Sequence, residues 1–145
     1  MKFIKVAVCA IAILSTSAFA QNLGIPIATT VTVTYPDSSS RFDPPAEVAL
    51  ALDEAKNAAV IYVYGRTSTS SPSPRDEALA FKRAAAARAY LINKGISPLK
   101  IMVNYASAAD YAVDNTSAWG RAANQRVEIE MVFIEQSYGD RYETN

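Results

Sequence analysis

Apolar residues recur along the chain with two spacings, every second residue in some stretches and every third or fourth in others. Alternation from Val31 to Tyr35 and from Val127 to Phe133 is typical of strands with one buried face. A shorter alternation from Leu99 to Val103 predicts a further strand. The nearly continuous apolar run from Ala59 to Tyr64 favours a central strand covered on both faces. The pattern therefore predicts four strands.

Helical spacing fills the two intervals between the first three strands. A helix is expected from about Pro45 to Asn57, since the prolines suit a first turn. A second helix, rich in alanine, is expected from Arg75 to Lys94, where Gly95 ends it. The long connection from Tyr105 to Asn124 predicts one short helix, over Ser117 to Ala123.

This order of elements predicts the fold class. Two strand–helix–strand units require right-handed crossovers, which place both helices on one face of a small sheet. We therefore expect an α/β (α+β) two-layer sandwich, formed by one domain over residues 31–135. Residues 21–30 are expected to be a flexible lead-in, and residues 136–145 a polar tail.

The first twenty residues have the features of a secretory signal peptide. Lys2 and Lys5 precede an apolar run from Val6 to Leu14, and Ala18-Phe19-Ala20 supplies a cleavage site. A transmembrane anchor is the alternative, but a helix needs about 20 apolar residues to cross a bilayer. Cys9 lies inside the run, and we interpret it as an incidental apolar residue. The remainder is expected to be exported.

Composition excludes several kinds of function. The 125 residues after the signal peptide carry 12 of the 14 basic side chains and all 14 acidic ones, so there is no basic footprint for nucleic acid. The chain has no histidine, and its one cysteine is Cys9, which removes thiol catalysis and the usual zinc sites. We expect no metal, no cofactor and no enzyme, because no nucleophile–base pair is visible. The serines from Ser68 to Ser73 read as loop residues.

Several sequence blocks carry a resemblance to a known family. The blocks are Lys82-Arg83-Ala84, Tyr90 to Ile96, Asp114-Asn115-Thr116, Gly120-Arg121-Ala122 and Asn124 to Ile129. Their order and spacing resemble those of the OmpA-like periplasmic domain, which outer-membrane proteins, peptidoglycan-associated lipoproteins and flagellar stator proteins share. The resemblance spans about residues 31–133 and implies a β-α-β-α-β-β fold with a mixed sheet.

The resemblance implies noncovalent binding of peptidoglycan, through the diaminopimelate of its stem peptide. The pocket would lie between the loop after the second strand and the second long helix, where an aspartate pairs with an ammonium group and an arginine binds a carboxylate. Arg83 occupies the position of that arginine. In the loop, Arg66-Thr67-Ser68 places Ser68 where the family has the aspartate. A neutral hydroxyl loses the charge-assisted part of the hydrogen bond, and Arg66 adds a repelling charge.

Three candidate binding residues also have structural interpretations. Asp76 could supply the missing carboxylate, or it could stabilise the start of the helix through the macrodipole. Arg83 could bind the ligand, or its head could pair with Asp76 while its stem packs on the sheet edge. Arg126, together with Asn124, could form the pocket rim or hold the preceding loop by hydrogen bonds.

The aromatic side chains suggest no binding site stronger than the one around Arg83. Tyr62 and Tyr64 lie on the expected central strand and are expected in the core, while Trp119 is the better exposed candidate for stacking.

Two functions remain open. The first is a periplasmic module, associated with the outer membrane, that binds peptidoglycan, weakly without the aspartate, and anchors an envelope assembly to the cell wall. The second is a structural component of a secretion or conjugation apparatus that has lost peptidoglycan binding and docks on envelope proteins such as outer-membrane secretion components.

Overall fold

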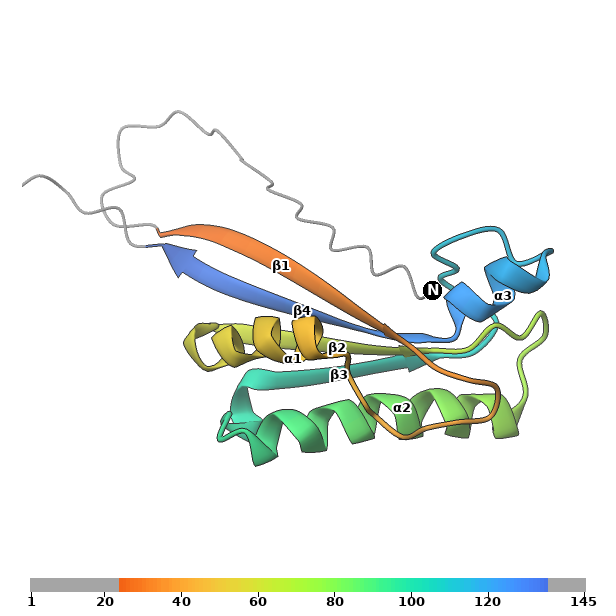
Figure 1. Cartoon of the computed structure of the whole chain (residues 1–145), viewed down its shortest axis with the longest axis horizontal. Coiled ribbons are helices and arrows are strands. Elements are labelled where there is room, and N and C mark those ends of the chain that lie inside the picture. The colour runs from red at the N-terminus through yellow and green to blue at the C-terminus, as the bar shows by residue number, and fades with distance from the viewer. Residues whose placement is uncertain (1–23, 136–145) are drawn as a thin grey trace, which may run out of the picture.

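The computed structural model describes residues 24–135 and contains a four-stranded mixed sheet in the order β1-β4-β2-β3 (Figure 1). β4 is antiparallel to both of its neighbours, and β2 and β3 are parallel. The predicted signal peptide and polar tail lie outside the described residues. The strands are β1 (Ile25–Thr34), β2 (Val60–Arg66), β3 (Ile101–Ala106) and β4 (Arg126–Glu135).

Two longer helical segments lie on one face of this sheet, and a short helix lies at its end, where β4 begins (Figure 1). The first is α1 (Ala46–Ala51), which continues as a 3-10 helix, η1 (Leu52–Asn57), and so is only half α-helical. The long helix α2 (Pro74–Asn93) follows β2, and η2 (Pro98–Lys100) leads into β3. The short helix α3 (Ala118–Asn124) precedes β4. No helix of the described part is both long and apolar enough to cross a membrane.

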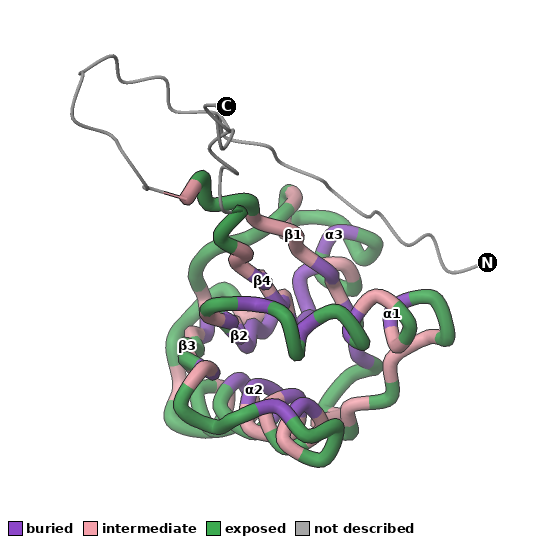
Figure 2. The backbone as a smooth tube through the Cα atoms, turned by 90° about the vertical axis from the view of Figure 1, so that its left-hand side faces the viewer, coloured by how far each residue is buried: buried purple, intermediate pink, exposed green. Residues whose placement is uncertain are grey.

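The core lies between the sheet and the two helical segments α1 and α2 (Figure 2). Three alanines, Ala80, Ala84 and Ala87, are buried on α2 beside Arg83 and Leu91, and these small side chains let the helix lie close to the sheet. At Gly65 of β2, a Cβ atom would lie 2.1 Å from the carbonyl oxygen of Ala80. The two-layer α/β sandwich is confirmed, and its main buried side chains are Val31, Val33, Val48, Leu52, Ile61, Val63, Ala84, Ala87, Leu91, Val127, Ile129 and Met131.

β1 begins earlier than the sequence pattern predicts. Residues 25–30, expected to be a flexible lead-in, pair with β4 in a continuous register from Ile25↔Glu135 to Thr30↔Glu130. Ile25 and Ile27 are exposed, so this half of the strand has no buried face to produce a clear alternation of polar and apolar positions.

β2 is covered on one face only, which corrects the expectation that both faces are buried. Ile61 and Val63 point into the core, whereas Tyr62 is 37% exposed on the opposite face. Tyr62 and Tyr64 stack there with ring centroids 6.3 Å apart, and the Tyr64 hydroxyl donates to Glu130 at 3.2 Å. These tyrosines are therefore surface residues of the sheet and not core residues.

Candidate functional site

Arg83 projects from α2 toward the end of the sheet where β2 ends and β4 begins, and it is fully buried. Its Nε donates to the carbonyl oxygen of Ser39 at 2.8 Å, and its Nη1 to that of Arg66 at 2.9 Å. Its Nη2 donates to Gln125 Oε1 at 2.8 Å and to the carbonyl oxygen of Pro36 at 3.3 Å. We call Pro36, Ser39, Arg66, Arg83 and Gln125 the Arg83 corner, since this one side chain joins three separate chain segments.

The hydrogen-bond acceptors of Arg83 among the described residues are all neutral groups. Its guanidinium lies 4.9 Å from the centroid of the Tyr35 ring, a cation–π contact. Burial lowers the pKa of Arg83, while Tyr35 and Asp37 act in the opposite direction. None of the ion pairs within residues 24–135 includes Arg83. A buried cation without a carboxylate partner is costly and is a feature of functional sites.

The alternative pairing of Arg83 with Asp76 does not form. The Asp76 carboxylate accepts a hydrogen bond from the Ser73 hydroxyl at 2.5 Å, and the Asp76 N–H donates to Ser73 Oγ at 3.1 Å. Ser73 is the residue that caps α2. Ser73 thus satisfies one backbone N–H of the first turn and also holds the Asp76 carboxylate, so the geometry agrees with the structural interpretation of Asp76.

The loop after β2 brings Thr67 and Ser68 to the same end of the sheet. Thr67 is buried, and its hydroxyl lies 3.1 Å from that of Thr69. Ser68 is half-buried, and its carbonyl oxygen accepts a hydrogen bond from Asn115 at 2.7 Å. The loop is therefore held against the connection that precedes α3.

Two other buried arginines lie near this end, and each has a carboxylate partner. Arg66 Nη2 lies 2.8 Å from Asp110 Oδ2, and Arg126 Nε lies 2.7 Å from Glu128 Oε1. Arg126 also donates to the carbonyl oxygen of Asp110 at 2.7 Å. The side-chain oxygen of Asn124 accepts from backbone N–H groups of the same connection. Arg126 and Asn124 thus hold the loop, as the structural interpretation proposed.

Sequence reasoning did not identify Gln125 as part of this corner, nor Tyr35 and Asp37 as the neighbours of Arg83 and Gln125. Gln125 accepts from Arg83 and donates to Asp37, and it therefore orients the buried guanidinium. Its place beside Asn124 in the closing sequence block was the only available signal. Trp119 is 68% exposed on α3, as expected. Residues 24–135 contain no group of three side chains that could hold a metal ion.

The mixed sheet, with α1 and α2 on one face and the buried Arg83 of α2 bonded to the end of β2, defines a two-layer α/β sandwich. The model of the OmpA family matches residues 34–125, and the chain belongs to this family.

Relatives from Brucella and Bordetella species match part of the chain. A protein named as an outer membrane lipoprotein of a type IV secretion system, from Brucella suis biovar 1 (strain 1330), is 40% identical over 72 residues, which are 50% of this chain and 42% of the relative. Outer membrane protein A of Bordetella avium is 34% identical over 97 residues, 67% of this chain and 48% of the relative. The chain thus spans less than half the length of these relatives.

A solved structure has the same fold. The peptidoglycan-associated lipoprotein from Burkholderia pseudomallei superposes with a TM-score of 0.60 at 19% identity, over 70% of this chain and 88% of that one.

Proposed function

We propose that the chain is a non-catalytic module of the bacterial envelope that binds peptidoglycan at the Arg83 corner. The observation that carries this proposal is a fully buried guanidinium whose acceptors are all neutral. A carboxylate of the stem peptide would replace Gln125 Oε1 or the Ser39 carbonyl oxygen as acceptor. The exchange is favourable because a planar guanidinium binds a carboxylate through two parallel hydrogen bonds.

The similar proteins support a location at the outer membrane, where a peptidoglycan-binding module would act. The matching relatives are named as outer membrane proteins, and the similar solved structure is named as a peptidoglycan-associated lipoprotein. On that basis we place the chain in the periplasm at the outer membrane, where it would attach an envelope assembly to the cell wall.

The proposed binding is weak, because the cationic end of the ligand lacks a carboxylate partner. Ser68 offers a neutral hydroxyl in the loop, and Asp76 is already engaged by Ser73. The Thr67 side chain is buried and lies beside Thr69. A charge-assisted hydrogen bond contributes about 1.5–3 kcal/mol, so its absence corresponds to a loss of roughly tenfold or more in affinity.

Pelleting with purified sacculi tests this proposal. Ser68→Asp should raise the retained fraction, and free diaminopimelate should compete with that retention. Ser70→Asp is the matched control, since it introduces the same charge at an exposed position of the same loop. Equal retention of the two variants, or retention that diaminopimelate does not reduce, would contradict binding at the Arg83 corner.

A second function is favoured by one specific observation. Arg83 already makes four hydrogen bonds within the protein and has no exposed surface. In this alternative the corner is purely structural, and the domain docks on proteins of a secretion apparatus such as the one named for the Brucella relative. Absence of sacculus retention for both the unmodified chain and Ser68→Asp, with both proteins folded, would favour this function over the first.

A further inference from the structure

β3 forms an outer edge of the sheet, and its sequence lacks the features that normally protect an edge. In the order β1-β4-β2-β3 it pairs only with β2 among the described strands. Edge strands usually carry charged residues or proline, which prevent pairing with other chains. Ile101–Ala106 contains neither, whereas the opposite edge strand, β1, contains Pro26. Within residues 24–135, the outer backbone edge of β3 is therefore open to an added strand.

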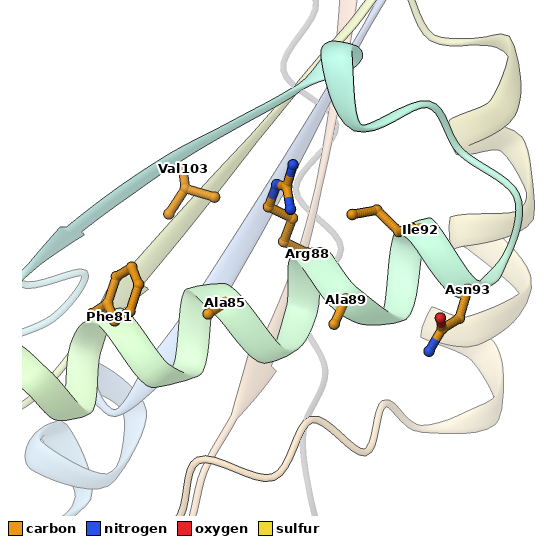
Figure 3. A pocket seen from close by; sticks show the side chains of 7 residues that line it. All are labelled: Phe81, Ala85, Arg88, Ala89, Ile92, Asn93 and Val103. Atoms are coloured by element: carbon orange, nitrogen blue, oxygen red, sulfur yellow. The ribbon is translucent and has the colours of Figure 1, made fainter.

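An apolar groove of about 450 Å³ runs between this edge strand and α2. Figure 3 shows Phe81 and Ile92 projecting from α2, and Val103 from β3, at the sides of the groove. Phe81 is 49% exposed and contacts the Tyr105 ring edge-to-face, with centroids 5.2 Å apart. Apolar side chains of an added strand would be buried here beside the free backbone edge.

The charge of the groove indicates the chemistry of its occupant. Arg88 is the only charged side chain in the groove lining, and no ion pair of residues 24–135 includes it. A second copy of the chain would bring the same positive groove to a two-fold interface, where like charges repel. A segment that carries carboxylates would instead complement Arg88.

We propose that the free edge of β3 binds an extended segment of a partner protein whose side chains on the face toward α2 are apolar except for one carboxylate. The segment adds a fifth strand to the sheet through backbone hydrogen bonds, its apolar side chains fill the groove, and a carboxylate pairs with Arg88. This surface is independent of peptidoglycan binding, since it shares no residue with the Arg83 corner.

Binding of two synthetic nonapeptides tests the proposal. In both, valine alternates with threonine, and the central valine is replaced by glutamate in one peptide and by lysine in the other, so that the charged residue shares a face with the remaining valines. Each peptide carries a fluorophore for anisotropy measurements on the purified chain. The glutamate peptide should bind about tenfold or more tightly than the lysine peptide, since one charge-assisted pair accounts for that ratio. Hydrogen exchange should slow at the backbone amides of 101–106 when the peptide binds.

Charge reversal at the groove supplies the matched comparison. Arg88→Glu should invert the preference between the two peptides. Arg75→Glu introduces the same change at an exposed position of α2 outside the groove lining and should leave the preference unchanged. Equal binding of the two peptides, no inversion in Arg88→Glu, or protection at β1 instead of β3 would overturn the proposal. The proposal would also be overturned if the chain alone sediments as a dimer and hydrogen exchange at residues 101–106 is slow in that dimer. The occupant of the edge would then be a second copy of the chain.

Discussion

Arg83 holds together the chain segments that follow β1, end β2 and precede β4, because it donates hydrogen bonds to all three. Its three guanidinium nitrogens reach three carbonyl oxygens and one side-chain amide, which belong to segments far apart in the sequence. A lysine could not replace it, since an ammonium group is a single point of donation on a flexible stem, whereas the guanidinium is a rigid planar fork. The same side chain therefore stabilises the fold and presents the candidate binding site.

Substitution of Arg83 should be strongly destabilising. Arg83→Ala leaves buried acceptors without donors, each costing about 1–3 kcal/mol, so we expect the free energy of unfolding to fall by at least about 3 kcal/mol. Arg83→Lys should recover only part of this loss. Urea denaturation measures both, with Arg75→Ala as an exposed control expected to change stability by less than about 0.5 kcal/mol. An unchanged urea midpoint in Arg83→Ala would show that these hydrogen bonds do not hold the loops.

Tyr35 should make the fold sensitive to alkaline pH. Burial raises the pKa of its phenol, with the charge of Arg83 acting against this, so the folded state favours the neutral form. In the unfolded chain the phenol ionises near pH 10. Its contribution to stability is therefore complete below about pH 10 and is lost as the pH rises toward the raised pKa of the folded state.

Tyr35→Phe should reduce this alkaline loss of stability and have little effect at neutral pH. The Tyr35 hydroxyl has no hydrogen-bond partner among the described residues, so its removal breaks no bond. Some loss should remain, since burial and Glu130 also raise the pKa of Tyr64. Thermal unfolding between pH 8 and pH 11 measures the effect, and Tyr105→Phe, at an exposed ring, is the matched control. If thermal stability falls equally steeply with rising pH in Tyr35→Phe and in Tyr105→Phe, Tyr35 is not the source of the alkaline sensitivity.

The site was partly predictable at the residue scale. Arg83 was identified because its sequence block resembles that of the family, but its acceptors could not be, because three of them are backbone carbonyl oxygens whose positions depend on the folded loops. Asp76 had two interpretations in the sequence, and its hydrogen bonds with Ser73 agree with a role at the start of the helix. Where these residues would contact a ligand stays a prediction.

At the scale of elements, the close approach of α2 to β2 depends on Gly65. The carbonyl oxygen of Ala80 occupies the space where a Cβ atom at Gly65 would lie, 2.1 Å away. The backbone cannot yield as a side chain could, so Gly65→Ala should separate helix and strand at a cost of about 1–3 kcal/mol. Urea denaturation tests this against Ser70→Ala in the exposed loop. Equal stability of the two variants would show that the sheet accommodates the methyl group without moving the helix.

The elements with the strongest patterns were predicted within a few residues. α2 combines helix-forming residues with a cap and a terminal glycine at positive φ, Gly95, so local and tertiary signals agree. The 3-10 segment η1 was not distinguished from an α-helix, because the three-residue spacing of Leu52 and Ala55 suits both. The open face of β2 was missed because tyrosine occurs both in cores and at surfaces.

At the scale of the whole molecule, the sheet narrows to two strands at one end. β4 pairs with β2 only as far as Val132, and residues 133–135 pair with β1 alone among the described strands. Isolated two-stranded ribbons are marginally stable. The order of the elements predicted the fold, but it could not predict this extension, since Ile25 and Ile134 bury little surface there.

Removal of the residues that precede Thr30 should therefore affect only the narrow end. The amides of residues 133–135 should lose their protection from hydrogen exchange, while those of β2 and α2 should keep theirs, because the core contacts of Val31 and Val33 remain. Exchange measured by mass spectrometry on the full and shortened chains tests this. Loss of protection throughout the sheet would show instead that the ribbon is required for the fold.

The pairing of Ile25 with Glu135 also determines how the domain would transmit mechanical force. Both ends of the described chain leave at the narrow end, and the Arg83 corner lies at the other end of β1 and β4, about 30 Å away along ten-residue strands. Tension between an anchor at the corner and an attachment at the chain ends would run parallel to these strands. Their ladder of hydrogen bonds lies across that direction, so many bonds would share the shear load instead of opening one after another.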